Sequence, residues 1–114
     1  MNPKLKKRDK YRWQLREDLQ VSVCDVDITI VAGFITDGAS IPESLQFLFP
    51  DRTKKPKLPA IIHDYLYAVH LVDKAEADLI FLELLKRDGV SLIKRWAMYL
   101  AVVIFGYHAW RKKC

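Results

Sequence analysis

The spacing of the apolar residues changes near residue 36, and this change constrains the fold more than any other feature of the sequence. Before it, apolar and polar residues alternate in short stretches, as at Leu19, Val21 and Val23, which is typical of half-buried strands. After it, apolar residues recur every three or four positions, which is typical of amphipathic helices. The pattern predicts an α+β fold with a small N-terminal antiparallel β-sheet, a loop and three packed helices.

Two stretches before residue 36 are expected to form the sheet. Residues 11–23 alternate in polarity with an interruption at residues 16–18, which indicates a hairpin or two short strands. Residues 28–35 are apolar and β-branched, and Gly33 marks a bulge or bend among them. Residues 1–10 are rich in lysine and arginine and are predicted to be a flexible arm, so that a single domain occupies residues 11–114.

Three helices are expected after the proline-rich loop of residues 50–59. Pro59 is suited to open the first helix, and Asp73-Lys74-Ala75-Glu76 resembles a capping box that starts the second. Asp88-Gly89 is suited to end the second helix, and Ser91 to cap the third. The third helix is apolar nearly all round, which predicts a central position in the core.

A short connection between the first two helices predicts which of their side chains meet. The turn lies near Leu71, with His63 eight residues before it and Asp78 seven residues after it. Because residues equally far from the turn of an antiparallel helical hairpin lie at the same level, Asp78 is expected to reach His63. A carboxylate that holds an imidazole in one tautomer leaves the other ring nitrogen able to accept a proton from water.

Two further carboxylates suggest a cation site next to this pair. Asp64 follows His63 on the helix, and Asp37 lies in a glycine-containing loop whose backbone carbonyls can face inward and, with water, add further oxygen ligands. An all-oxygen site suits Ca²⁺, whereas no cysteine or histidine spacing of a zinc site is present. Each residue also has an ordinary structural interpretation: a turn for Asp37, polarity of the helix for His63 and Asp64, compensation of the helix dipole for Asp78, and packing for Tyr67, which lies on the same helix face as His63.

Charge and cysteine content limit the other classes of function. The formal charge is +5, with basic clusters at both ends that either bind phosphate or are simply solvated. The two cysteines make no disulfide framework, which favours a reducing compartment. No signal peptide is recognisable, and the uncharged run from Trp96 to Trp110 is short of the roughly 20 residues of a membrane-spanning helix. This run is predicted to be a buried core helix, with an interfacial helix as the alternative.

Several segments together resemble the DUF1353 family of small bacteriophage and prophage proteins. The resemblance runs from about residue 11 to the end and rests on Gly33–Pro42, Ala60–Tyr67, Ala75–Asp78 with Phe81, Met98–Val102, Phe105-Gly106 and Trp110. It implies a phage origin, and therefore a location in the virion or in the host cytoplasm.

A second resemblance, to the bacterial and fungal type of secreted phospholipase A2, suggests a chemistry. It rests on the order Asp37-Gly38-x-Ser40, His63-Asp64-x-x-Tyr67, the helical Asp78, a Tyr-x-x-x-Val and Phe-Gly. It implies a three-helix core in which His63 is the base, Asp78 orients it and Tyr67 supports the pair, while Asp37, the carbonyl of Gly38 and Asp64 bind Ca²⁺. This chain departs from those enzymes at Ala39, where they have a cysteine, and in its additional strands, so the core can be shared while the activity is lost or redirected.

We therefore expect a phage-encoded, calcium-dependent hydrolase of the phospholipase A2 type that acts on phospholipid of the host envelope. The alternative is a non-enzymatic virion component, such as a tail or baseplate protein, whose partners are other virion proteins and whose His-Asp cluster holds the fold. Nucleic-acid binding ranks third because it rests on charge alone. The sequence does not define an oligomeric state.

Overall fold

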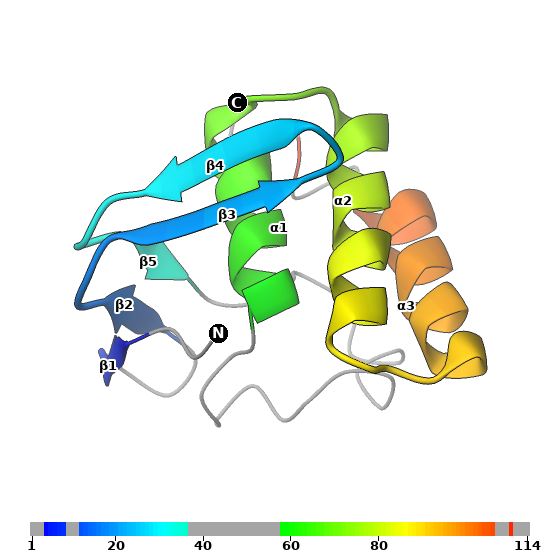
Figure 1. Ribbon diagram of the computed structural model, residues 1–114, viewed down its shortest axis with the longest axis horizontal. Coiled ribbons are helices and arrows are strands. Elements are labelled where there is room, and N and C mark those ends of the chain that lie inside the picture. Colours follow the sequence, from blue (N-terminus) through cyan, green and yellow to red (C-terminus); the bar gives the residue numbers. More distant parts are fainter. Residues whose placement is uncertain (1–3, 9–11, 37–57, 107–109, 111–114) are drawn as a thin grey trace.

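The structure is a computed structural model that describes residues 4–8, 12–36, 58–106 and 110. Within these ranges the strands precede the helices, as the change in apolar spacing predicts, and the fold is α+β. The strands are β1 (Leu5–Lys7), β2 (Trp13–Leu15), β3 (Leu19–Val23), β4 (Val26–Ile30) and β5 (Ile35–Thr36). The helices are α1 (Leu58–Val69), α2 (Lys74–Arg87) and α3 (Leu92–Phe105), and Figure 1 shows α2 between the other two.

The strands divide between two small antiparallel sheets where the sequence predicted one. One sheet has the order β1-β2-β5, and the other is the hairpin of β3 and β4. Strand β1 pairs with β2 so that Leu5 lies opposite Leu15, which differs from the flexible arm expected for residues 1–10. Leu5 is half-buried against the core, so backbone pairing and apolar contact together hold these three residues in place.

The two turns around β4 require unusual backbone conformations. The β3–β4 hairpin closes through Cys24 and Asp25, which both have positive φ angles, of 51° and 62°. Two successive positive φ angles define the type I′ turn that matches the twist of two-residue hairpins. Beyond β4 the chain bends at Gly33, where φ is 102°, and this confirms the bend expected there.

The helix ends follow the capping signals in the sequence. The Asp73 carboxylate accepts a hydrogen bond from the backbone N–H of Glu76, and Ser91 caps α3 by accepting from the N–H of Lys94. Helix α2 ends at Asp88, and Gly89 follows with a positive φ of 78°. These contacts confirm the predicted starts of α2 and α3 and the predicted end of α2.

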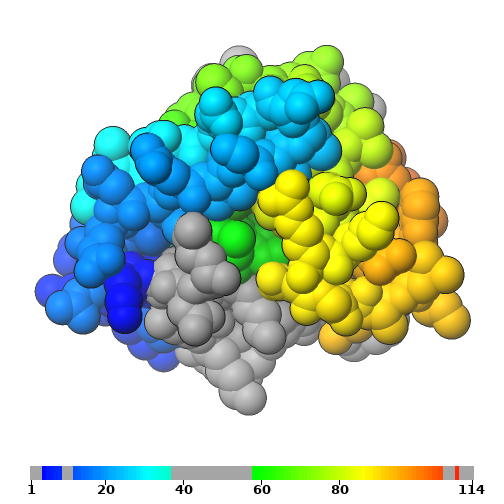
Figure 2. All heavy atoms as spheres, viewed as in Figure 1, coloured from blue at the N-terminus to red at the C-terminus, as the bar shows by residue number. Residues whose placement is uncertain are grey.

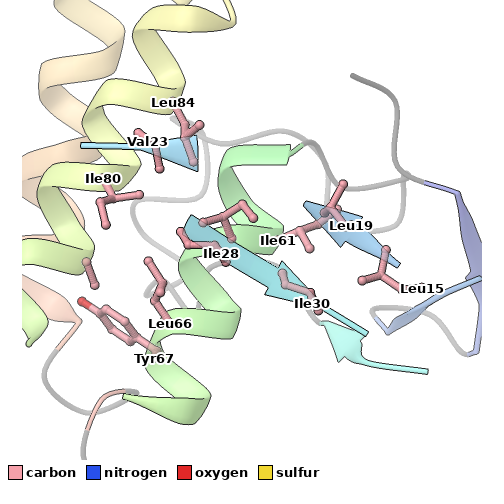
Figure 3. Packing of buried hydrophobic residues seen from close by; sticks show 12 residues of the cluster. Leu15, Leu19, Val23, Ile28, Ile30, Ile61, Leu66, Tyr67, Ile80 and Leu84 are labelled. Carbon is pink, nitrogen blue, oxygen red and sulfur yellow. The ribbon is translucent and has the colours of Figure 1, made fainter. Parts of the chain in front are cut away.

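The main core lies between the strands and the α1–α2 pair. Figure 3 shows side chains of the β3–β4 hairpin facing those of the two helices, and Ile30, Ile61 and Leu66 are fully buried there. The apolar stripe of α2 is buried, and it consists of Ala77, Ile80, Phe81, Leu84 and Leu85. Its residues Ala77, Ile80 and Leu84 belong to the main core with α1, whereas Phe81 and Leu85 pack with Met98 and Val102 of α3. This packing fixes the relative position of the helices, on which the candidate site depends.

Helix α3 does not occupy the central position predicted from its apolar composition. It packs against α2 at the side of the molecule away from β1 and β2, and only Met98, Ala101 and Val102 among its residues are buried. Among the described elements α2 is its main neighbour and covers one stripe of the helix, and the apolar side chains on the opposite face are exposed. None of the helices in the described ranges is long and apolar enough to cross a bilayer.

Candidate functional site

The hairpin of α1 and α2 brings His63 and Asp78 together as predicted. Nε2 of His63 lies 2.9 Å from Oδ1 of Asp78, and both side chains are buried, with 3% and 1% of the residue surface exposed. An ionised carboxylate can only accept hydrogen bonds, so Nε2 is the donor. In the neutral ring the proton therefore lies on Nε2, and Nδ1 carries the lone pair.

Two more donors complete the environment of Asp78. The Tyr67 hydroxyl donates to the same oxygen as His63 at 2.6 Å, and Nζ of Lys74 donates to Oδ2 at 2.8 Å. The Lys74 ammonium also donates to the carbonyl oxygens of Val102 and Val103, at 3.2 and 3.1 Å. These last carbonyls of α3 carry the negative end of its helix dipole, which is a favourable place for a cation. One buried carboxylate thus connects all three helices.

The ionised form of Asp78 is stabilised despite its burial. Burial favours the neutral acid and by itself would raise the pKa of Asp78. The hydrogen bonds from His63, Lys74 and Tyr67 outweigh burial and lower this pKa below its ordinary value of 3.8. At neutral pH the cluster therefore contains a carboxylate that can hold the imidazole and stabilise its protonated form.

Aromatic rings surround the imidazole. The His63 ring centroid lies 4.1 Å from that of Tyr67 and 4.8 Å from that of Phe81, and both contacts are tilted. These rings and the Asp78 bond fix the orientation of the imidazole. Among the described residues, Nδ1 of His63 has no hydrogen-bond partner, so this nitrogen is the one able to accept a proton.

Gly106 determines how closely α3 approaches Tyr67. A Cβ atom at this position would lie 2.6 Å from the Tyr67 hydroxyl oxygen and would also overlap the carbonyl oxygen of Val102. The absence of a side chain at Gly106 therefore lets the Tyr67 hydroxyl reach Asp78 beside the end of α3. The glycine of the Phe-Gly pair at the end of α3 thus has a steric role in the cluster.

The residues predicted to bind a cation are only partly within the described ranges. Asp64 is buried on α1, directly after His63, whereas Asp37 and Gly38 lie outside the described residues. Within those ranges, no group of three or more His, Cys, Asp or Glu residues is arranged to hold a metal ion. The predicted juxtaposition of Asp37 and Asp64 therefore remains a prediction.

Lys74 is the member of the cluster that sequence reasoning assigned only to a capping box. Its spacing from Asp78 is i,i+4, at which oppositely charged side chains on a helix meet. That spacing was visible in the sequence. The contact with the α3 carbonyls was not, because it joins positions 28 and 29 residues apart.

These features define a small α+β domain with a buried His-Asp pair, a tyrosine and a lysine at the junction of three helices. The family model described as "Protein of unknown function (DUF1353)" matches residues 13–102, and the chain belongs to this family. Comparison with curated proteins and with solved structures found no match.

Proposed function

We propose that this protein is a phage-encoded hydrolase in which His63 activates water for attack on an ester, in the manner of phospholipase A2. The observation that supports this most directly is the 2.9 Å contact between Nε2 of His63 and Asp78, with Tyr67 on the same carboxylate oxygen. A base of this kind needs a fixed tautomer and a counter-charge, and the cluster has both.

In the proposed reaction Nδ1 of His63 accepts a proton from water as the water oxygen attacks the ester carbonyl. Asp78 remains ionised and stabilises the imidazolium, and the Tyr67 hydroxyl keeps the carboxylate in place. The proton then passes from Nδ1 to the alcohol that leaves. Because the His63 side chain is buried, substrate reaches Nδ1 in this proposal only when the packing around α1 opens locally.

Calcium is the proposed cofactor, with Asp37, the Gly38 carbonyl and Asp64 as its ligands. When bound, such an ion would polarise the ester carbonyl and stabilise the oxyanion. Oxygen atoms from two carboxylates and one backbone carbonyl are a suitable ligand set for Ca²⁺, with water completing its coordination. Phospholipid of the host envelope is the proposed substrate.

The test compares His63→Gln with wild type for fatty-acid release from phospholipid vesicles, with calcium and with a calcium chelator. The glutamine amide can still donate to Asp78 but cannot act as a base, so we expect the fold to persist and release to be lost. His70→Gln is the matched control, since it makes the same change just after α1, where the His70 side chain contacts Trp110 rather than His63 or Asp78. Equal release by wild type and His63→Gln, or release unaffected by the chelator, would exclude the mechanism.

A second candidate function is supported by Lys74. Its ammonium binds Asp78 at 2.8 Å and the end of α3, which is the arrangement expected of a network that holds helices together. In this alternative the protein is a non-enzymatic virion component, and its partners are other virion proteins. A constant number of copies of this protein in each purified phage particle, combined with absence of ester hydrolysis by wild type, would favour this alternative.

A further inference from the structure

The outer face of α3 is apolar along its whole length. The side chains opposite the α2 contact have between 45% and 84% of their surface exposed, and they are Leu92, Ile93, Trp96, Leu100 and Ile104. Figure 2 shows α3, in orange, at the side of the molecule that the strands do not cover. Single exposed apolar residues are ordinary on protein surfaces, but a continuous row of them marks an interaction site.

The geometry of the helix places these side chains in one strip. At 100° per residue, positions 92, 93, 96, 100 and 104 fall within about 120° of the helix circumference, and only Val103 lies among them. The strip therefore contains no polar side chain. A helix of 14 residues is about 21 Å long, so the strip is as long as the helix itself.

The net charge of the chain lies in the same part of the sequence. Residues 1–88 contain 14 basic and 14 acidic residues, whereas residues 89–114 contain five basic residues and no acidic one. The five are Lys94, Arg95, Arg111, Lys112 and Lys113. Residues 89–114 therefore carry a net charge of +5 in the sequence, and in the described part of this segment Lys94 is exposed in the first turn of α3.

We propose that the outer face of α3 is a docking surface for an anionic phospholipid bilayer, on which the helix lies parallel to the membrane plane. Apolar side chains on one face with basic residues alongside are what interfacial helices use to bind anionic lipid. A second copy of this chain is the less favourable occupant, because α3 itself contains two basic residues, Lys94 and Arg95, and no acidic one, so two facing helices would bring like charges together. Acidic headgroups complement that charge.

Docking through α3 is independent of the proposed hydrolysis, since none of its outward residues contacts His63 or Asp78 among the described interactions. Vesicles of ether-linked phospholipid, which lack an ester to hydrolyse, keep the two properties separate. Failure of docking would leave the hydrolase proposal open, and absence of hydrolysis would leave docking open.

The experiment is flotation of the full chain with ether-linked phosphatidylcholine vesicles, with and without phosphatidylglycerol. We expect binding to the anionic vesicles, weaker binding at high salt, and none to phosphatidylcholine alone. Leu100→Gln should weaken binding about fivefold to tenfold, as expected for an apolar side chain that is half exposed in solution. The matched control is Leu79→Gln on α2, since Leu79 and Leu100 are both 50% exposed.

Three results would overturn this proposal. Equal binding to neutral and anionic vesicles would remove the role of charge. Equal weakening by Leu79→Gln and Leu100→Gln would remove the role of α3. Absence of vesicle binding, together with a dimer in light scattering that Leu100→Gln dissociates, would assign the face to a second copy of the chain.

Discussion

Replacing Asp78 with asparagine removes one charge from the cluster and changes little else in size or shape. The amide oxygen can still accept the hydrogen bonds of His63 and Tyr67. The amide nitrogen, however, replaces the oxygen that accepts from Nζ of Lys74 at 2.8 Å, so two donors face each other there. Asp78→Asn thus leaves a buried ammonium without its carboxylate.

The expected loss of stability follows from these three contacts. A hydrogen bond to a charged group contributes about 1.5–3 kcal/mol, and a neutral one about half as much. Losing the Lys74 bond and weakening the other two gives about 3–5 kcal/mol, which is also the usual cost of removing one partner of a buried ion pair. For a chain of this length the melting temperature should fall by roughly 12–25 °C.

The loss should depend on pH because the folded state lowers the pKa of Asp78. A carboxyl group with a lowered folded-state pKa contributes its stability at pH values above its unfolded pKa and loses it as pH falls through the folded-state value. The difference in the free energy of unfolding between wild type and Asp78→Asn should therefore have its largest value at pH 7. It should become smaller below about pH 4, where the protonated acid resembles the amide.

Urea unfolding followed by circular dichroism measures both effects, at pH 7 and again at pH 3. Asp73→Asn is the matched control, since it makes the same substitution at the exposed start of α2, where asparagine caps a helix as well as aspartate. A loss below about 1 kcal/mol for Asp78→Asn at pH 7, or a difference that does not narrow in acid, would refute the role assigned to the cluster.

Three other predictions concern stability, the first two measured by the same urea assay and the third by acid unfolding. Gly106→Ala should cost about 1–3 kcal/mol because its Cβ displaces the Tyr67 hydroxyl, and the cost should be smaller in a Tyr67→Phe background, which has no hydroxyl to displace; equal costs in both backgrounds would contradict the steric explanation. Cys24→Asn with Asp25→Gly should stabilise the protein by about 1 kcal/mol, since both positions have positive φ; an unchanged urea midpoint would argue against backbone strain at this turn. Lys74→Met should raise the pKa of Asp78 by removing a hydrogen bond that lowers it, so the acid unfolding transition should move to higher pH than in wild type; an unmoved transition would mean that Lys74 does not stabilise the carboxylate.

Features that depend on local interactions could be predicted from the order of the amino acids. The capping residues Asp73 and Ser91 are recognisable because each bonds a backbone N–H three residues away. The contact of His63 with Asp78 was predictable for a similar reason, because a short connection between two helices leaves few ways to arrange them. The residues named for a cation site include Asp37 and Gly38, outside the described ranges, so that prediction is still to be tested.

Features that depend on which distant segments meet could be seen only in the folded molecule. Periodicity shows that α3 is apolar but does not say how many neighbours cover it. Among the described elements α3 packs mainly against α2, so the predicted core helix has an exposed apolar face. The pairing of β1 with β2 and the contact of Lys74 with the carbonyls of Val102 and Val103 likewise join segments whose contact no local pattern records. Local hydrogen bonds and spacing fix the elements, whereas competition among apolar surfaces for a limited core decides which of their faces remain exposed to solvent.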